Sequence, residues 1–152
     1  MQRVCMGGTF DVFHRGHEVL IQTALEISNQ VLIGLTTDER AGKGRLGSQI
    51  TSYDKRKDRL EDWLKSQRVE RRVEIVPLND DWGPAALGKE FEGIIVSQET
   101  EDMALALNQI REEKGIDKLK IIVVPMVQAY DGHRISSSRI RNGEINSKGL
   151  RT

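Results

Sequence analysis

Two histidines three residues apart are the first candidates for chemistry. They are His14 and His17 in GGTFDVFHRGHEVL, residues 7–20, and the chain has three histidines in all. His17 stands where a helix is expected to begin, so free backbone N–H groups and the positive end of the helix dipole would favour an anion there. Two imidazoles beside that turn could donate hydrogen bonds to phosphate oxygens. A metal site is an alternative without an obvious third ligand, since His133 lies in another loop, and incidental surface histidines are a further one.

Glycines precede the histidines and limit the kinds of nucleotide site that fit. Gly7 and Gly8 end an apolar run, so the backbone there can lie close to a ligand. The turn lacks the G-x-G-x-x-G pattern, and no stretch of the chain matches G-x-x-x-x-G-K-[ST], which argues against nicotinamide-dependent dehydrogenases and P-loop enzymes. Asp11 is expected to bond backbone N–H groups rather than a metal.

Hydroxyls and guanidiniums gather in a second segment, ISSSRIR, residues 135–141. Three serines at the start of a short helix, with two arginines on its first turn, could hold a polyphosphate through N–H donors, O–H donors and fixed positive charge. A glycine-rich segment, AGKGRLGSQ at residues 41–49, adds Lys43 and Arg45 and is typical of a loop that contacts phosphate. A plain solvated loop is the alternative for that segment.

The elements that would position these groups form an alternating pattern. Apolar runs predict strands at 3–8, 30–37, 71–78, 93–97 and 120–127, and helical periodicity predicts helices at 17–28, 54–67 and 101–114. Thr51 or Ser52 is the expected N-cap of the second helix; Thr100 and Gly115 bound the third. The order predicts an α/β, Rossmann-like, doubly wound five-stranded parallel sheet with helices on both faces. The candidate residues then collect at the carboxyl edge of the sheet, where such folds bind ligands.

Length and composition set broad limits. The 152 residues fit one domain, 1–152, and the 23 basic and 23 acidic residues cancel, so we expect neither nucleic acid nor a membrane surface as a partner. The single cysteine, Cys5, excludes an internal disulfide and a cysteine-based zinc cluster. Without an apparent leader or an apolar run long enough to span a bilayer, a cytoplasmic protein is expected. The sequence does not indicate an oligomeric state.

The two motifs together resemble a known signature pair. GGTFDVFHRGH and ISSSRIR are similar to the HxGH and ISSxxxR motifs of the nucleotidyltransferase superfamily. With IGLTTDERAGKG, VSQET and DGHRISSSRIRNGEI, the stretch from Gly7 to about Gly149 resembles the archaeal and eukaryotic phosphopantetheine adenylyltransferase family, in which threonine is common where this chain has Ser138. The resemblance implies transfer of AMP from ATP, with Mg²⁺, to 4′-phosphopantetheine in coenzyme A biosynthesis, without a covalent intermediate.

The resemblance also implies roles for individual residues. His17 would donate to the α-phosphate with His14 beside it, Thr9 would bond the incoming phosphate or the α-phosphate, and Lys43 would bridge the two, with Arg45 as the alternative. Arg111 would reach the substrate. The residues implied in holding ATP are Gly8, Thr9, Phe10, Ser97, Gln98, Glu99, Ser136, Ser137, Ser138, Arg139 and Arg141. No protein metal ligand is implied.

Other functions stay open at this point. Sister enzymes of the superfamily keep both motifs and use a different acceptor: nicotinamide mononucleotide adenylyltransferase, FAD synthetase and glycerol-phosphate cytidylyltransferase. A nucleotide-binding module without turnover is the alternative outside the enzymes.

Overall fold

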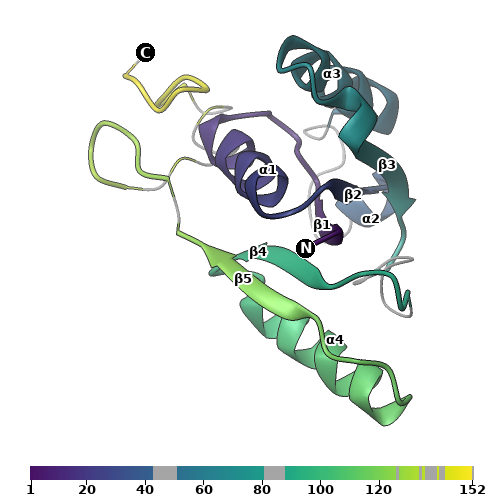
Figure 1. Ribbon diagram of the computed structural model, residues 1–152. Coiled ribbons are helices and arrows are strands. Elements are labelled where there is room, and N and C mark those ends of the chain that lie inside the picture. Colours follow the sequence, from purple (N-terminus) through teal and green to yellow (C-terminus); the bar gives the residue numbers. More distant parts are fainter. Residues whose placement is uncertain are drawn as a thin grey trace.

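The chain forms a five-stranded sheet flanked by helices (Figure 1). The computed structural model describes residues 1–42, 51–80, 88–125, 127–133, 135, 140 and 143–151. The elements in chain order are β1 (Arg3–Gly8), α1 (Arg15–Ile27), β2 (Gln30–Thr36), α2 (Asp38–Gly42), α3 (Tyr53–Ser66), the 3-10 helix η2 (Glu70–Arg72), β3 (Val73–Leu78), β4 (Gly93–Ser97), α4 (Glu101–Glu113) and β5 (Lys120–Val124).

All neighbouring strands are parallel, in the order β3-β2-β1-β4-β5. β1 pairs with β2 along its whole length, from Arg3 opposite Gln30 to Gly8 opposite Leu35. β1 and β4 pair only near their amino ends, at Val4 with Gly93 and at Cys5 with Ile94. Strand order reverses between these two strands, so their carboxyl ends separate at the place where doubly wound folds bind ligands. The predicted parallel sheet is confirmed.

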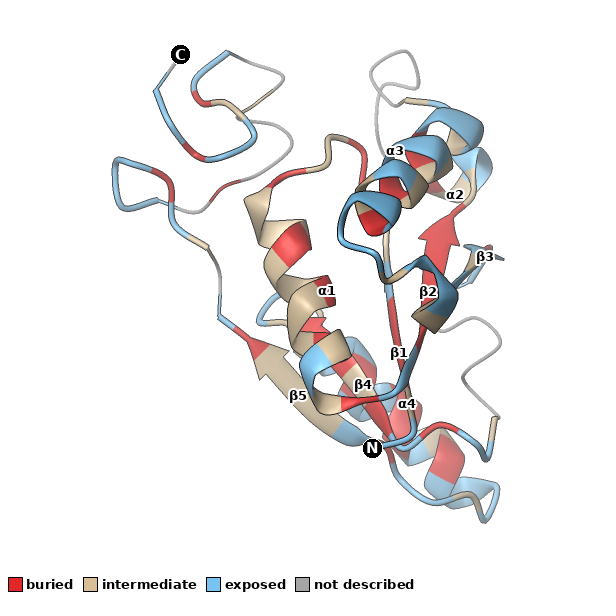
Figure 2. Cartoon of the chain, turned by 45° about the horizontal axis from the view of Figure 1, so that its top comes forward, coloured by how far each residue is buried: buried red, intermediate tan, exposed pale blue. Residues whose placement is uncertain are grey.

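Helices cover both faces because the central strands carry apolar side chains on both. Val4 and Met6 of β1 belong to the core under α1 and α3, which contribute Ile21 and Leu60 among others. The side chain between them, Cys5, points to the opposite face and packs with Leu107 of α4. Figures 1 and 2 show α1 and α3 on one side of the sheet, α4 on the other, and buried positions along the strands between them.

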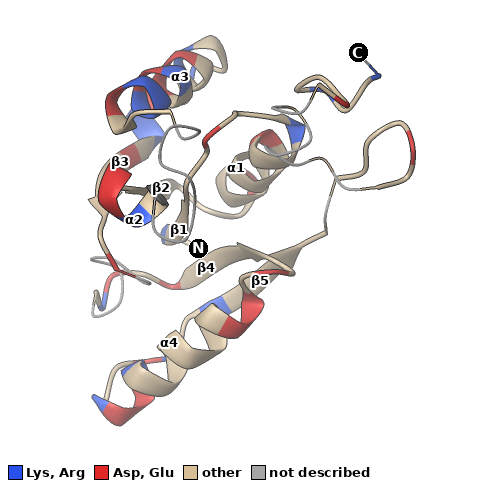
Figure 3. Ribbon diagram, turned by 180° about the vertical axis from the view of Figure 1, so that it is seen from behind, with Lys and Arg blue, Asp and Glu red and all other residues tan. Residues whose placement is uncertain are grey.

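The charged helix α3 keeps a narrow buried stripe under a mixed surface. Leu60 and Leu64 are buried as predicted, and Trp63 is partly buried against the same core. Acidic and basic residues are interspersed along the rest of the helix (Figure 3). Ser52 is the N-cap and accepts a hydrogen bond from the N–H of Lys55 at 3.5 Å. No helix in the described part of the chain combines the length and the apolar character that a bilayer crossing needs.

Several boundaries differ from the sequence prediction for physical reasons. β5 ends at Val124 instead of residue 127, because Pro125 follows and has no N–H to extend the ladder. β3 starts two residues late, after η2, whose Arg72 donates to carbonyls at the end of α1. The helix α2 is not predicted by the sequence pattern, since its five residues, DERAG, are too few to show a period.

Candidate active site

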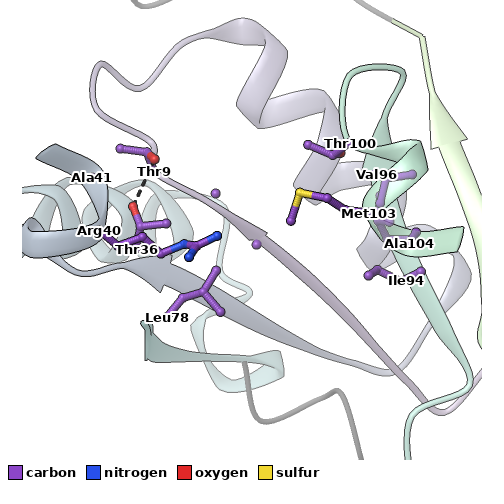
Figure 4. A pocket seen from close by; sticks show the side chains of 13 residues that line it. Thr9, Thr36, Arg40, Ala41, Leu78, Ile94, Val96, Thr100, Met103 and Ala104 are labelled. Atoms are coloured by element: carbon purple, nitrogen blue, oxygen red, sulfur yellow. Dashed lines mark hydrogen bonds between the residues drawn. The ribbon is translucent and has the colours of Figure 1, made fainter. Parts of the chain in front are cut away.

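A cavity of about 480 Å³ opens at the carboxyl edge of the sheet, where β1 and β4 separate. Figure 4 shows Thr9, Thr36 and Arg40 on one side of it, and Met103 and Ala104 of α4 on the other. The cavity is therefore polar at one end and mainly apolar at the other. Its described lining residues are Gly7, Gly8, Thr9, Thr36, Arg40, Ala41, Leu78, Ile94, Ile95, Val96, Thr100, Met103 and Ala104.

His14 and His17 begin α1 with a reciprocal pair of hydrogen bonds. His14 is the N-cap, and its Nδ1 accepts from the N–H of Gly16 at 3.0 Å. His17 Nδ1 in turn accepts from the N–H of His14 at 3.2 Å. This is a capping box in which imidazole nitrogens replace the usual hydroxyl and carboxylate oxygens. The two rings stack, with centroids 3.7 Å apart and planes inclined by 22°.

This capping fixes the tautomer of both rings. A ring nitrogen that accepts a hydrogen bond carries no proton, so each neutral imidazole must carry its hydrogen on Nε2. Burial lowers the pKa of His14 to about 4, against the opposing effect of nearby Glu18. Burial also lowers the pKa of His17 to about 3, and His14 adds to that shift. Near neutral pH the pair therefore presents two uncharged rings, each with one Nε2–H donor.

The backbone of the first turn of α1 has partners within the protein, which corrects one expectation. The N–H of Arg15 donates to the carbonyl of Ser147 at 2.8 Å, and that of Gly16 donates to His14 Nδ1. The next two N–H groups donate to the carbonyl of His14 at 2.9 and 3.1 Å. Free backbone donors are thus not what this turn offers a phosphate. The donors that it supplies are the Nε2–H groups of its two histidines.

Thr9 and Phe10 connect β1 to the histidines. Thr9 Oγ1 accepts a hydrogen bond from Thr36 Oγ1 at 3.0 Å at the polar end of the cavity. Phe10 has φ +49°, a conformation that few non-glycine residues adopt, and its ring lies 4.8 Å from that of His17. Because the Phe10 side chain is buried, it supports His17, and any contact of Phe10 with a nucleotide has to come from its backbone.

A buried arginine that the sequence analysis does not identify holds this edge together. Arg56 of α3 is 0% exposed, and its Nη1 donates to the carbonyls of Thr9 at 2.9 Å and Thr36 at 2.8 Å. Its Nε donates to the carbonyl of Thr51 at 2.8 Å, and its Nη2 to Asp38 Oδ1 at 3.0 Å. The signal for this burial is helical phase, since Arg56 stands four residues before Leu60 on the buried stripe.

The carboxylate of Asp11 bonds a backbone N–H, as expected, and the donor lies 40 residues away in the chain. Asp11 is 2% exposed, and its Oδ1 accepts from the N–H of Thr51 at 2.8 Å. A carboxylate that bonds a backbone N–H in this way acts as a structural acceptor. Asp11 and Arg56 therefore both fasten Thr51, two residues before α3, to the end of β1.

Ser97 ends β4 at the same edge of the sheet. Its N–H donates to Thr100 Oγ1 at 3.2 Å, and the N–H of Thr100 donates back to the carbonyl of Ser97 at 3.1 Å. Thr100 occupies the predicted N-cap position of α4, but its hydroxyl serves this turn and makes no cap hydrogen bond. Gln98 and Glu99 are exposed in the turn. Their predicted contact with adenosine stays a prediction.

Arg111 lies away from these residues, so its predicted contact with substrate is corrected. It belongs to the last turn of α4, about ten residues or roughly 15 Å from the end that lines the cavity. Its guanidinium is buried and donates to the carbonyls of Asp117 at 2.8 Å and Gly88 at 3.0 Å. Asn108, one turn earlier, donates to the carbonyl of Leu119 and accepts from its N–H, just before β5. Arg111 thus supports the amino edge of the sheet.

Part of the predicted site lies outside the described residues. This applies to Lys43 and Arg45 of the glycine-rich segment and to five residues of ISSSRIR, namely Ser136, Ser137, Ser138, Arg139 and Arg141. The segment beyond β5 does reach α1: besides the Ser147 carbonyl, Lys148 Nζ donates to Glu18 Oε2 at 3.2 Å. Trp63 Nε1 donates to the same carboxylate at 3.0 Å. Glu18 therefore joins the C-terminal segment, α1 and α3.

Metal ligands do not form a cluster in the described ranges, where no group of three or more histidine, cysteine, aspartate or glutamate side chains could hold an ion. Cys5 offers no nucleophile either. Burial raises the pKa of its thiol to about 12, so it stays protonated at neutral pH. Among the described residues, the groups suited to chemistry are the hydrogen-bond donors of the carboxyl edge.

Comparisons with known proteins agree with this geometry. Residues 5–143 match the family model described as cytidylyltransferase-like. A phosphopantetheine adenylyltransferase from Methanosarcina barkeri is 46% identical over 98% of this chain and 92% of its own length. One from Methanopyrus kandleri is 40% identical over 95% and 90%. A crystal structure of an Archaeoglobus fulgidus protein of unknown function superimposes with TM-score 0.71 at 33% identity, covering 82% of this chain and 89% of that one.

Proposed function

The chain belongs to the cytidylyltransferase-like family, and we propose that within it this protein transfers AMP from ATP to 4′-phosphopantetheine in coenzyme A biosynthesis. The products are dephospho-coenzyme A and pyrophosphate. The observation that carries the assignment is the 46% identity, over 98% of the chain, to a relative that bears this activity in its name. The site supports it physically, since it gathers neutral donors for phosphate beside a cavity for an acceptor.

The chemistry needs positioning and charge stabilisation rather than an activated side chain. A phosphate oxygen of the acceptor forms a bond to the α-phosphorus of ATP, and the bond from that phosphorus to the β-phosphate oxygen breaks as pyrophosphate leaves. His17 Nε2–H donates to an α-phosphate oxygen as charge develops, with His14 Nε2–H beside it. Neutral donors suit this step because they hold an oxyanion without transferring a proton to it. The protonated Cys5 thiol is consistent with direct attack.

The cavity fits an acceptor with a charged head and a long, weakly polar arm. Its polar end presents Thr9, Thr36 and the cation of Arg40, which suit a phosphate group. Its other end is walled by aliphatic and thioether groups, including Ile94, Val96 and Met103, which suit the arm of a pantetheine (Figure 4). A rigid aromatic ring, as in nicotinamide mononucleotide or flavin mononucleotide, matches this division less well.

The remaining parts of the site are assigned by sequence. Lys43, or Arg45, neutralises the reacting phosphates, and the serines and arginines of ISSSRIR hold the β- and γ-phosphates. Mg²⁺ accompanies ATP through the nucleotide phosphates and neutralises their charge; an ion held in this way keeps several waters and needs no dedicated protein cage. Ser97, Gln98 and Glu99 border the adenosine. Dependence on ATP and Mg²⁺ favours a cytoplasmic location, with residues 1–152 acting as one catalytic domain.

A pyrophosphate-release assay tests the function. The protein is given ATP, Mg²⁺ and, in separate reactions, 4′-phosphopantetheine, nicotinamide mononucleotide or flavin mononucleotide; a further reaction pairs CTP with glycerol 3-phosphate. We expect pyrophosphate only with ATP and 4′-phosphopantetheine, and dephospho-coenzyme A in equal amount by mass spectrometry. Release with another pair alone would assign a sister enzyme. Nucleotide binding by calorimetry without release from any pair would assign a binding module.

A further inference from the structure

We infer that Thr36 and Arg56 are positioning residues that make the hydroxyl of Thr9 a hydrogen-bond donor toward the phosphate of the acceptor. The inference rests on the proposed function, because it assumes a phosphorylated acceptor in the cavity. Neither Thr36 nor Arg56 stands out from the sequence as a member of the site. They act through Thr9, and the inference therefore concerns how a substrate contact is prepared.

The three side chains form a hydrogen-bonded chain that ends at the cavity. Arg56 Nη1 donates to Thr36 Oγ1 at 3.4 Å, and Thr36 Oγ1 donates to Thr9 Oγ1 at 3.0 Å. The two hydrogens of the same Nη1 also donate to the backbone carbonyls of Thr36 at 2.8 Å and Thr9 at 2.9 Å, so the longer bond to Thr36 Oγ1 shares one of these hydrogens. Arg56 is 0% and Thr36 7% exposed, so these bonds face little competition from water. Figure 4 shows the contact between the two threonines at the polar end of the cavity.

The direction of each bond follows from what each group can do. A guanidinium has donors and no acceptor, so the Thr36 hydroxyl has to accept from Arg56 with a lone pair. The one hydroxyl proton of Thr36 is then free to donate, and it points at Thr9 Oγ1. Thr9 Oγ1 accepts that proton, which leaves its own proton for another acceptor. Since Thr9 lines the cavity, that acceptor is a group bound in the cavity.

A phosphate is well matched to a hydroxyl oriented in this way. Its ionised oxygens accept hydrogen bonds, and a positioned O–H donates to them without first giving up a competing orientation. Charge on Arg56 polarises the chain, so each bond strengthens the next. The arrangement also limits selectivity to acceptors whose head group accepts hydrogen bonds; a head group that only donates would meet a hydroxyl directed against it.

The test compares Thr36→Val with Thr36→Ser. Valine keeps the branched shape and removes the hydroxyl, whereas serine keeps the hydroxyl and should restore the contact. We expect Thr36→Val to lower kcat/KM for 4′-phosphopantetheine roughly tenfold, the effect of one hydrogen bond to a charged group, with the KM for ATP within about twofold of wild type. Thr36→Ser should stay within about threefold of wild type in both. Thr23→Val is the matched control, since Thr23 Oγ1 donates to Val19 within α1, away from the cavity.

A double-mutant cycle separates positioning from general support of the fold. Thr9→Val alone should lower kcat/KM for the acceptor strongly, and adding Thr36→Val to it should change little more, because Thr36 acts through Thr9. Independent, multiplicative losses would overturn the inference, as would wild-type kcat/KM in Thr36→Val. If Thr36→Val does not fold, Thr36→Ala takes its place in the same cycle. Wild-type protein that releases no pyrophosphate with 4′-phosphopantetheine would instead refute the proposed function.

Discussion

Arg56 and Arg111 are two buried arginines that support opposite edges of one sheet. Both guanidiniums donate to backbone carbonyls, Arg56 to Thr9 and Thr36 at the carboxyl edge and Arg111 to Asp117 and Gly88 at the amino edge. The difference lies in what the held backbone carries. At the carboxyl edge it carries the hydroxyls of Thr9 and Thr36, which line a cavity, and at the amino edge it carries turns between elements. We therefore expect similar interactions to support catalysis at one edge and stability alone at the other.

The largest expected effect comes from removing a donor at the carboxyl edge without disturbing its fold. His17→Asn keeps a side-chain acceptor for the N–H of His14 and removes the Nε2–H. We expect turnover to fall by roughly 10²–10³-fold, as for other preorganised donors, with the melting temperature within a few degrees of wild type. Pyrophosphate release and thermal melts measure the two quantities. Turnover within tenfold of wild type would show that His17 does not contact the transferring phosphate.

The second prediction concerns acid, which should weaken the carboxyl edge through its histidines. Their pKa values of about 4 and 3 in the folded protein lie below the ordinary value of 6.5, so between these limits the unfolded chain binds protons that the folded chain does not. The free energy of unfolding should therefore fall as pH drops below about 6.5, by up to about 1.4 kcal/mol per pH unit for each histidine. Urea unfolding at pH 7.5, 6.0 and 5.0 measures the slope.

The double variant His14→Asn/His17→Asn is the control for that slope. It removes both titrating rings and keeps short acceptors at both capping positions, so its free energy of unfolding should depend less steeply on pH than that of wild type. An unchanged slope would mean that other groups, such as the carboxylates, cause the acid sensitivity. Arg111→Lys, at the other edge, should keep the wild-type slope.

The third prediction sets the two arginines against each other. Arg56→Lys and Arg111→Lys each leave buried carbonyls without a donor, so each should lower the free energy of unfolding by about 1–3 kcal/mol. Arg56→Lys should also lower kcat/KM for the acceptor by roughly three- to tenfold, since Thr9 and Thr36 lose part of their support. Arg111→Lys should keep kcat/KM near wild type at a temperature where both variants are folded. Equal loss of activity in the two variants would contradict the expected difference in function between the two edges.

The smallest effect is expected at the clasp between Lys148 and Glu18. The Lys148 side chain is 61% exposed, so the free energy of unfolding in Lys148→Met should fall by no more than about 1 kcal/mol. Because the C-terminal segment meets α1 at this clasp, the KM for ATP should rise about twofold. Steady-state kinetics at two salt concentrations measures this, and in wild type the KM should rise with salt as the pair is screened. A KM for ATP that is the same in the variant and in wild type would show that the clasp between Lys148 and Glu18 does not affect the site.

Much of the architecture is predictable from sequence because local pattern decides it. Apolar runs mark all five strands, and capping residues such as Ser52 and Gly115 mark helix ends. The histidine motif also places His14 and His17 at the start of α1, beyond the carboxyl end of β1. The observed boundaries differ from the predicted ones where a neighbouring residue ends the element, as Pro125 does after β5.

The sequence pattern cannot predict contacts between residues that are far apart in the chain. The occupied backbone of α1 depends on the Ser147 carbonyl, more than a hundred residues away in the chain. Residue type alone did not reveal that Arg111 and Arg56 both donate to buried backbone carbonyls, and Arg111 was expected to reach the substrate instead. The sheet sets the direction of α4, and this direction places the last turn of the helix at the amino edge.

The histidine capping box has a consequence for protein design. Serine or aspartate at position 14 would begin a helix at least as well, yet neither carries a second nitrogen to face a substrate. Because the residues that cap α1 are also the proposed donors to phosphate, we expect a substitution that improves the cap to lower the activity. Transplanting this site to another scaffold requires moving His14, Arg15, Gly16 and His17 together with the turn before them, as one conformational cassette.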